Sequence, residues 1–451
     1  MLKKKIVSIV LSVVLLISSL SACGSKPAED RSFGDKTTRG TLRICVDTSL
    51  GLSDTDELTK RYFTKLSEEI KTACGIEKVA FEMVPQAGAD RETVLQRLRT
   101  EIMAGTGPDL FLMSTVANGS GLNTRDALFT FPEKNMEAGL FLPLDEYMEN
   151  DTQFTDWNEQ TQTVMQAGRN SEGQVIIPLT YTFQVLVFPE SRVNIPFTKD
   201  LTMQEILNDP KTQDIGALMY SCLYRSDPED HDTTTINLRH LSTVLGKLAD
   251  YEKEELLFTE EELFDIQTNV FGLYEAAQAQ CEFQFMKTDI TERDFFYELH
   301  TAYFDEEMAI APIYSENGGV TASITAFAAV NRNTKLPEET FTVLDYLMRE
   351  DFQRDSELFS NYFTNGIPLQ NDLGQEGKSI YNFGREGYVL DKNQSEDLLA
   401  IKEQITAVNF DTEIDVVLKE LIYESIFENN SIVSREAVSD GYDKMKRMMG
   451  E

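Results

Sequence analysis

Apolar and polar positions after residue 40 recur with two different periods. A period of two over residues 42–46 and 79–83 predicts strands, and a period near four over residues 58–70 and 90–102 predicts helices. The unbroken apolar run of residues 110–113 is typical of a strand that is covered on both faces. The resulting order, β-α-β-α-β, predicts an α/β fold built on a parallel sheet with right-handed connections.

Glycine, aspartate and proline mark the predicted ends of the helices. Gly75 and Gly105 are expected to stop the two N-terminal helices, and Asp90 is expected to cap the second one. Pro337 is expected to start a later helix, with Phe341 on its apolar face. These residues set helix boundaries before any packing is considered.

The middle of the chain is more broken, with short apolar runs between polar loops. Residues 175–178 and 185–189 look like two extended segments near a lobe boundary, and residues 215–220 form another apolar strand. A late strand is expected over residues 308–313, followed by a glycine-rich turn at residues 317–319. No internal repeat is visible.

The N-terminus has the pattern of an export signal. Three lysines precede the apolar run of residues 6–17, which is shorter than the roughly 20 residues that span a bilayer. Leu20-Ser21-Ala22-Cys23 then matches a lipobox, in which the cysteine takes diacylglycerol before cleavage. We therefore expect a signal peptide over residues 1–22, lipid on Cys23, and a lipidated tether over residues 23–40. The alternative is an ordinary secretory leader with a chance cysteine.

Charge and length narrow the function classes. The formal net charge of −35 argues against binding to nucleic acid or flat contact with anionic lipid. About 430 residues remain after the leader, which is a natural length for two lobes. We expect a monomer held by its lipid on the extracellular face of a bacterial cell membrane.

Four cysteines follow Cys23, and their spacing matches no metal or redox motif. They are Cys45, Cys74, Cys222 and Cys281. No disulfide bridge is predicted, and Cys45, within an apolar strand pattern, is expected to be a buried thiol.

Five stretches of the chain, taken in order, carry a resemblance to a known family. They are RLRTEIMAGTGPDLFLM (97–113), GLFLPLDEYM (139–148), VIIPLTYTFQVLVF (175–188), ITAFAAVNRNTKLPEETFTVLDYLM (324–348) and SREAVSDGYDKMKRMMGE (434–451). These stretches resemble segments of the solute-binding proteins of ABC importers, and the nearest branch is the one that binds sugars and oligosaccharides. The sequence departs from that branch at Phe188-Pro189, where the family has Tyr-Asn, and in having a single tryptophan.

The resemblance implies a two-lobe periplasmic-binding-protein-like fold of type II, each lobe a sheet flanked by helices. Lobe 1 is expected to hold residues 41–180 and 296–318, and lobe 2 residues 181–295 and 319–451. The lobes would close on a small solute by a hinge at the crossing segments and deliver it to the transmembrane subunits of a permease. No cofactor or catalysis is expected.

Candidate ligand-binding residues follow the predicted strands, because ligands of open α/β sheets bind beyond the carboxyl ends of the strands. Asp47 follows the first strand and Ser114 with Thr115 follows the third, while Tyr181 and Thr182 lie on the crossing. Each has a structural alternative. Asp47 would cap a loop, the hydroxyls would close a turn, and Tyr181 would pack at the hinge.

Further candidates fall on the second lobe and its neighbours. The best cluster is Tyr220, Tyr224 and Arg225, which offers two rings and a guanidinium to a sugar. An ordinary surface loop is its alternative. Tyr314 and Ser315 follow the late strand, where the family often carries an aromatic platform. Trp157 is the last candidate, with a packing anchor as its alternative.

Two rival function classes were weighed against solute binding. An exported glycoside hydrolase needs two carboxylates across a cleft, and 76 acidic residues make such pairs unavoidable and therefore uninformative. A surface scaffold or adhesin would show repeats or Ser/Thr/Pro-rich stalks, and none is visible. The group Asp227, Asp230, His231 and Asp232 offers oxygen ligands to a calcium ion, but its spacing lacks the regular alternation and the glycine of a known calcium loop, which favours a solvated acidic turn.

Overall fold

In the computed structural model, the described part of the chain lies within Ser32–Glu451 and holds most of the N-terminal half and of the region from residue 318 to 369. The described residues are 32–35, 39–48, 57–86, 88–115, 126–150, 153–157, 161–189, 205, 251–252, 255–256, 260–261, 264, 286–289, 308–312, 314, 318–363, 366–369, 392–410, 412–414, 417 and 434–450. Among these residues, no helix combines the length and the hydropathy needed to cross a membrane.

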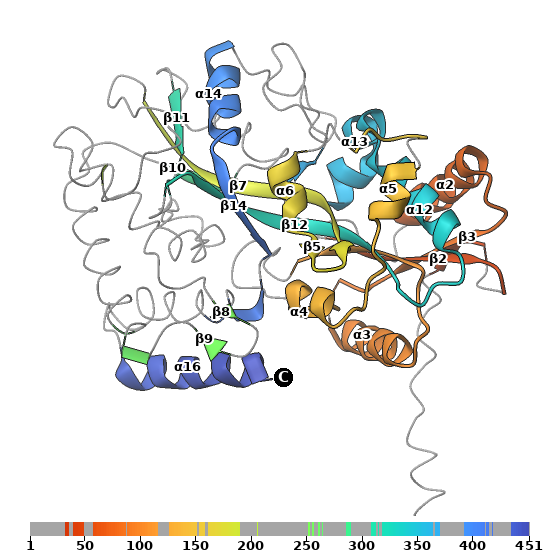
Figure 1. The fold of residues 1–451 in the computed structure, drawn as a ribbon, viewed down its shortest axis with the longest axis horizontal. Helices are drawn as coiled ribbons and strands as arrows, with labels where there is room; N and C mark the ends of the chain where they lie inside the picture. Colours follow the sequence, from red (N-terminus) through yellow and green to blue (C-terminus); the bar gives the residue numbers. More distant parts are fainter. Residues whose placement is uncertain are drawn as a thin grey trace, which may run out of the picture. The chain divides into compact units, whose positions relative to one another are not determined.

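Strands and helices alternate from β2 to β4, and runs of helices and of strands follow (Figure 1). The strands are β1 (Ser32–Gly34), β2 (Leu42–Asp47), β3 (Val79–Met83), β4 (Leu110–Ser114), β5 (Arg169–Asn170), β6 (Gly173–Gln174), β7 (Ile177–Pro189), β8 (Tyr251–Glu252), β9 (Glu255–Leu256), β10 (Met286–Asp289), β11 (Met308–Pro312), β12 (Val320–Val330), β13 (Ile367–Pro368) and β14 (Ile405–Phe410). The helices are α2 (Glu57–Cys74), α3 (Gly88–Met103), α4 (Pro132–Glu137), α5 (Asp145–Asn150), α6 (Gln162–Gln166), α12 (Pro337–Met348), α13 (Glu350–Asp355), the π-helix η1 (Leu358–Tyr362), α14 (Lys392–Lys402) and α16 (Arg435–Gly450).

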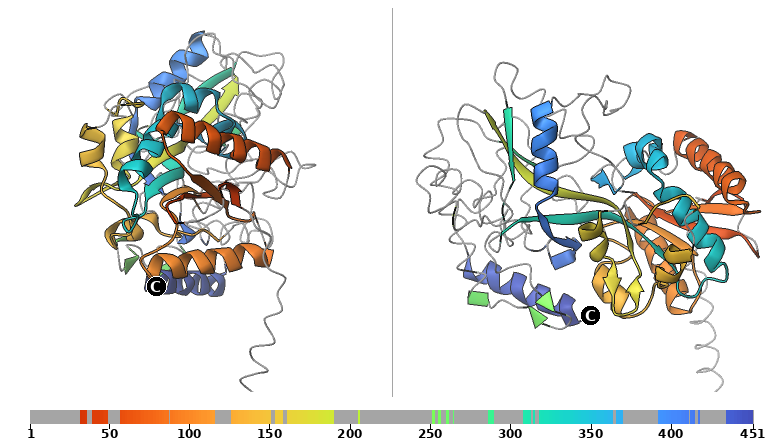
Figure 2. Two further views of the ribbon diagram at one scale, coloured as in Figure 1. Left: turned by 90° about the vertical axis from the view of Figure 1, so that its right-hand side faces the viewer. Right: turned by 45° about the horizontal axis from the view of Figure 1, so that its top comes forward.

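The N-terminal strands form the parallel sheet that the hydrophobic periods predict. β2 lies between β3 and β4, with Ile44 opposite both Phe81 and Leu110. Helices α2 and α3 cover opposite faces of these strands (Figures 1 and 2). The apolar side chains of all three strands are buried, as expected for a sheet covered on both sides. The predicted β-α-β-α-β unit and α/β fold class are confirmed.

The predicted helix ends are confirmed at the glycines and wrong at Asp90. Gly75 and Gly105 both adopt positive φ, 68° and 70°, a conformation that glycine reaches without strain. The second helix begins at Gly88, so Asp90 lies inside its first turn instead of capping it. A carboxylate in the first turn is still favourable, because it faces the positive end of the helix dipole.

Two long strands, β7 and β12, join different parts of the same sheet, and we call them the crossing strands. The second half of β12 pairs with β4, with Val330 opposite Leu110, and its first half pairs with β14. The first part of β7 pairs with β12, and the remainder pairs with β10 and β11. The main path of the sheet therefore runs β1-β3-β2-β4-β12-β7-β10.

The crossing strands correct one sequence expectation. Residues 175–178 and 185–189 were expected as separate segments, but one strand runs from Ile177 to Pro189. The intervening residues alternate threonine with large apolar side chains, which suits a strand paired along both halves. The other crossing strand begins at Val320, and its first residues pair with β14.

β12 carries an extra residue where its pairing changes. Ile324 lies opposite Tyr181 and Ala326 lies opposite Thr180, so the backbone register between the two strands skips Thr325. Such a β-bulge bends a strand locally and re-aims its backbone groups. It lies where β12 passes from pairing with β14 to pairing with β4.

The helix after β12 packs on the N-terminal unit. α12 contacts α2, and the ring of Phe341 on α12 lies 5.9 Å from that of Trp157. Residues 319–451 were assigned to lobe 2, whereas this helix packs on a helix assigned to lobe 1. The lobe boundaries themselves stay a prediction.

Candidate functional site

Polar side chains gather where the three parallel strands end. The carboxyl ends of parallel strands meet at one edge of a sheet, and here Asp47 of β2 lies opposite Met113 of β4. We call Asp47, Thr48, Gln86, Ser114 and Thr115 the rim. Gln86, three residues beyond β3, donates a hydrogen bond of 2.6 Å from its amide nitrogen to the Thr48 hydroxyl. The rim thus connects all three strand ends.

Asp47 is buried in an ion pair. Its carboxylate accepts two hydrogen bonds from the guanidinium of Arg91 on α3, at 2.9 and 2.6 Å. Asp47 is 1% exposed and Arg91 is 4% exposed. A bidentate pair of this kind fixes orientation as well as charge. The geometry therefore favours the structural alternative for Asp47, a carboxylate that holds a loop.

Arg91 also donates to two backbone carbonyls. Its Nη1 reaches the Pro85 oxygen at 2.8 Å, and its Nε reaches the Asp126 oxygen at 2.9 Å. Nη2 donates to the same Asp126 oxygen. One side chain therefore connects the end of β2, the loop after β3, and the residue at which the described chain resumes after Thr115.

A chain of hydroxyl contacts runs from the rim into the crossing strands, and we call Thr115, Thr325 and Thr180 the hydroxyl chain. The backbone nitrogen of Thr115 donates to the Thr325 carbonyl at 3.0 Å, and its hydroxyl donates to the same oxygen at 3.3 Å. The Thr325 and Thr180 hydroxyls are 2.7 Å apart. All three residues are at most 4% exposed. The bulge in β12 is thus held directly by a rim residue.

Two buried serine hydroxyls, one on β4 and one on β12, have unused hydrogen-bonding capacity. Ser114 is 3% exposed and Ser323 is fully buried, and within the described part of the chain neither hydroxyl has a hydrogen-bond partner. A buried polar group without a partner is costly, so an enclosed water or ligand would stabilise both. Thr182, which lies opposite Ser323 on β7, is buried as well.

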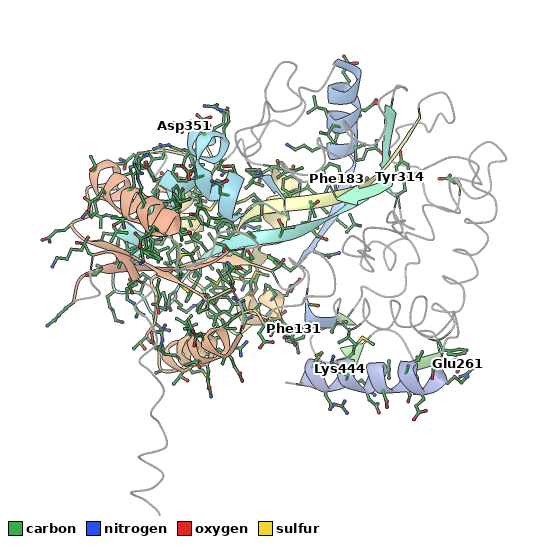
Figure 3. The ribbon with its side chains drawn as sticks, turned by 180° about the vertical axis from the view of Figure 1, so that it is seen from behind. Phe131, Phe183, Glu261, Tyr314, Asp351 and Lys444 are labelled. Carbon is green, nitrogen blue, oxygen red and sulfur yellow. The ribbon has the colours of Figure 1, made fainter. Side chains whose placement is uncertain are left out.

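The aromatic candidates are buried as well. Tyr181 and Tyr314 are fully buried, and Trp157 is 5% exposed. Tyr181 stacks on Phe183, at a centroid distance of 6.5 Å, and Figure 3 labels Phe183 on β7 and Tyr314 beyond β11. Burial raises the pKa of the Tyr181 phenol, and the nearby Thr161 side chain opposes that rise. These rings contact a solute only if the solute is itself enclosed.

Comparison with known proteins gives structural matches alone. No protein-family profile matches the sequence, and no curated protein matches it. An extracellular solute-binding protein of family 1 from Alicyclobacillus acidocaldarius is 12% identical, with a TM-score of 0.54 over 92% of this chain and 100% of its own. A periplasmic oligogalacturonide-binding protein from Yersinia enterocolitica is 13% identical, with a TM-score of 0.53 over 91% and 99% of the two chains.

The chain has the fold of the extracellular solute-binding proteins. A de novo designed cysteine esterase matches similarly, at 14% identity and a TM-score of 0.55 over 92% of this chain and 99% of its own. The predicted two-lobe fold class and the resemblance on which it was based are therefore confirmed. The fold alone does not decide between binding and catalysis.

The remaining predicted site residues lie outside the described part of the chain. They are Cys23, Tyr220, Tyr224, Arg225 and Ser315, together with the acidic group Asp227, Asp230, His231 and Asp232. Their roles stay predictions. Within the described residues, no three histidine, cysteine, aspartate or glutamate side chains are placed to hold a metal ion.

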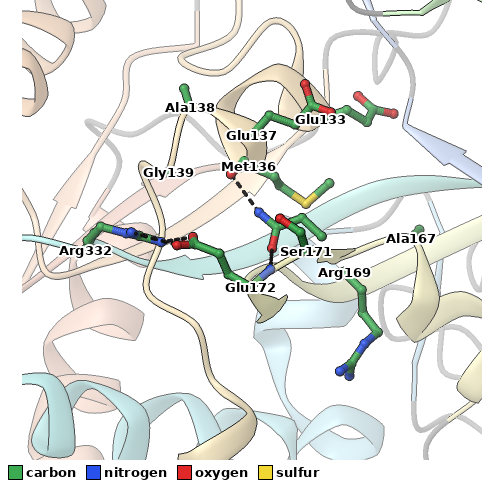
Figure 4. A pocket seen from close by; sticks show the side chains of 11 residues that line it. Glu133, Met136, Glu137, Ala138, Gly139, Ala167, Arg169, Ser171, Glu172 and Arg332 are labelled. Atoms are coloured by element: carbon green, nitrogen blue, oxygen red, sulfur yellow. Dashed lines mark hydrogen bonds and ion pairs between the residues drawn. The ribbon is translucent and has the colours of Figure 1, made fainter.

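A separate pocket of about 720 Å³ lies between α4 and the β5–β6 hairpin (Figure 4). Its charged side chains contact one another or their neighbours. Arg332 pairs with Glu172, and Arg169 pairs with Asp145. Arg332 follows the end of β12 that pairs with the start of β4, whereas the rim lies at the opposite end of β4. The pocket is therefore distinct from the rim, and no sequence motif indicated it.

Arg91, Thr325 and Thr180 are not among the residues predicted from the sequence. Arg91 stands between Asp90 and Glu92 in a charged stretch that looks like the solvated face of a helix. Its partner Asp47 is 44 positions away, so no local pattern could pair them. Thr325 and Thr180 follow a strand alternation that gives no sign of the bulge joining them.

Proposed function

We propose that this protein is the solute-binding component of an ABC importer and captures a sugar or oligosaccharide. The observation that carries the proposal is the chemistry of the rim within a solute-binding fold. Apart from the self-neutralised pair of Asp47 with Arg91, the rim offers hydroxyls and one amide. Such groups both donate and accept hydrogen bonds, as sugar hydroxyls do.

A charged solute would fit this rim less well. A buried charge needs an opposite charge or several directed hydrogen bonds to offset its lost hydration. Both oxygens of Asp47 already accept from Arg91, and the Arg91 donors go to Asp47 and to backbone carbonyls. The rim therefore favours a neutral polyhydroxyl solute over an amino acid or a polyamine.

Capture proceeds by closure of two lobes about the crossing strands. The lobes are residues 41–180 with 296–318 and residues 181–295 with 319–451. A solute stabilises the closed form only through contacts that it makes to both lobes. The burial of Ser114, Thr115 and Tyr181 supports this mode, because buried side chains contact a solute only inside an enclosed site.

The mature protein is anchored through diacylglycerol on Cys23 to the extracellular face of a bacterial cell membrane. Residues 1–22 are the signal peptide that is removed, and two acyl chains hold a protein stably where one does not. In this position the closed, loaded form delivers its solute to the transmembrane subunits of a permease.

Binding without catalysis is the favoured activity over glycoside hydrolysis. A glycosidase needs two carboxylates that flank the scissile bond, one of them protonated. The rim contributes one carboxylate, Asp47, and its oxygens are held by Arg91. A designed esterase with this fold shows that catalysis can be built on it, so product formation has to be measured directly.

A thermal-shift screen tests the proposal. The protein is heated with neutral mono- and oligosaccharides, amino acids and polyamines, and each mixture is analysed for product. A solute at about 100 times its Kd stabilises the folded state by about 2.7 kcal/mol. We expect a rise in Tm with neutral sugars and no product. A rise with amino acids or polyamines alone, or hydrolysis of an oligosaccharide, would contradict the proposal.

The rim itself is tested by a matched pair of threonine variants. Thr115→Val removes a rim hydroxyl, and Thr93→Val removes an exposed hydroxyl that bonds within α3. We expect the sugar-induced rise in Tm to shrink in the first variant and to persist in the second. Equal shifts in both variants would remove the rim from the binding site.

A further inference from the structure

The donor count of Arg91 shows what this side chain does at the rim. A guanidinium has five N–H donors. Two of them go to the carboxylate of Asp47, one goes to the Pro85 carbonyl, and two go to the Asp126 carbonyl. No donor remains for a solute. Arg91 therefore acts on binding, if at all, through the chain segments that it holds.

Those segments are the ones that border the rim. Asp47 ends β2, Pro85 follows β3, and Asp126 is the first described residue after Thr115. Thr115 is itself held by the Thr325 carbonyl. The described residues on both sides of segment 116–125 are thus held in place: Thr115 by the Thr325 carbonyl, and Asp126 by Arg91.

We infer that Arg91 is a positioning residue that holds the rim in its binding geometry, and that Asp47 acts through Arg91 instead of contacting the solute. This inference rests on the proposed function. A buried ion pair is weak support for stability in itself, and its best-attested role is to select one geometry. Arg91 reaches the rim from α3, which is a regular helix, so its contacts hold the three segments in place relative to a rigid element.

The decisive comparison is between Arg91→Lys and Asp47→Asn. Lysine keeps the charge but loses the planar fork that reaches three segments at once. Both variants should weaken solute binding by at least tenfold, to a similar extent, because both disconnect the same contacts. If Asp47 contacted the solute directly, Asp47→Asn would lose binding while Arg91→Lys kept it, and that result would overturn the inference.

The control variant is Arg332→Lys. Arg332 also combines a carboxylate partner, Glu172, with a backbone carbonyl, that of Phe141, but it lies at the opposite end of β4. Affinities are measured by calorimetry with the neutral trisaccharides maltotriose, cellotriose and mannotriose, below the unfolding temperature of every variant. The control should keep its Kd within twofold. If Arg91→Lys lowers Tm but also keeps its Kd within twofold, Arg91 is merely structural.

A second readout does not depend on a bound solute. Cys45 is fully buried in β2, two residues before Asp47, and Cys74 ends α2. Alkylation of each thiol by iodoacetamide is followed by peptide mass spectrometry. Arg91→Lys should speed the labelling of Cys45 at least tenfold relative to Cys74, because β2 loses its anchor at that end. Arg332→Lys should leave this ratio unchanged.

The two readouts separate the inference from the proposed function. If none of the three sugars binds the natural sequence, the sugar assignment fails for these solutes, and the thiol ratio still decides the role of Arg91. If sugars bind but Arg91→Lys changes neither Kd nor the thiol ratio, the proposed function stands and the positioning role is refuted.

Discussion

At the rim, a buried charge is held by an opposite charge, whereas in the crossing strands buried hydroxyls are held by one another and by a bulged carbonyl. The contact between Arg91 and Asp47 has one good arrangement, because a planar fork meets a planar carboxylate. The contact between Thr180 and Thr325 joins two hydroxyls that can each rotate and exchange donor and acceptor roles.

This difference separates a rigid region from a region that can change shape. Moving a buried ion pair apart costs several kcal/mol, while re-pairing two hydroxyls costs about 1 kcal/mol or less. The proposed hinge therefore fits the crossing strands, and the proposed binding surface fits the rim. Thr115 connects the two, since it ends the rim and donates to the bulge at Thr325.

The largest expected effect comes from breaking the ion pair. Arg91→Gln and Asp47→Asn each leave one buried charge without its partner, and each should lower the free energy of unfolding by about 3–5 kcal/mol. The double variant removes both charges, so it should lose clearly less than the sum of the singles. Urea unfolding at pH 7 measures all three.

An exposed ion pair provides the control for that experiment. Arg354 pairs with Asp355 on the surface of α13, and Arg354→Gln should change the free energy of unfolding by less than about 1 kcal/mol. A loss no larger than this in the Arg91 and Asp47 variants would mean that the rim is not anchored by the pair.

A smaller effect is expected in the crossing strands. Thr325→Val keeps the shape of the side chain but takes the hydrogen-bond partner from the buried Thr180 hydroxyl, which should cost about 1–2 kcal/mol. Adding Thr180→Val should cost little more, because no unpaired hydroxyl then remains. Thr93→Val, on the exposed face of α3, is the control for urea unfolding. Additive losses from the two crossing-strand variants would show that the hydroxyls are not coupled.

The sequence predicted local structure well and long-range contacts poorly. Residues 42–113 alternate strand and helix by period alone, and glycine at positive φ ends both helices, so this region could be predicted. The full length of β7 could not, because its strand partners come from the distant segments β10, β11 and β12. The end of a predicted strand indicates a rim at Asp47. The guanidinium that pairs with this carboxylate comes from a helix whose local sequence gives no sign that Arg91 is buried.

The same limit applies to the candidate site. Asp47, Ser114, Thr115, Tyr181 and Thr182 were found because the fold places ligand contacts beyond strand ends and on crossings. Their burial, and the direct contact from Thr115 to the bulge, depend on side-chain packing that periodicity does not encode. The solute roles of these residues, and of Tyr314 and Trp157, stay predictions until binding is measured.

The smallest effect, and a further comparison of the two regions, is expected at alkaline pH. Burial raises the pKa of the Cys45 thiol in β2 well above its ordinary value, and burial raises the pKa of the Tyr181 phenol in β7. A raised pKa in the folded state means that the unfolded chain loses its proton first. The stability due to each group is therefore complete below its unfolded pKa, about 8.5 for cysteine and about 10 for tyrosine, and is lost as pH rises from there toward the folded pKa.

The part of the decline that depends on Cys45 should thus begin at a lower pH than the part that depends on Tyr181. The Cys45 contribution to this loss is about 0.8 kcal/mol at pH 9. The free thiol ionises from about pH 8.5, so Cys45→Ala should make the decline in the free energy of unfolding shallower between about pH 8.5 and 10. Tyr181→Phe should change the decline only above about pH 10. Urea unfolding at a series of pH values measures both slopes. If Cys45→Ala and the natural sequence decline in parallel, the Cys45 thiol ionises as freely in the folded protein as in the unfolded chain, and β2 is more open at this position than its packing indicates.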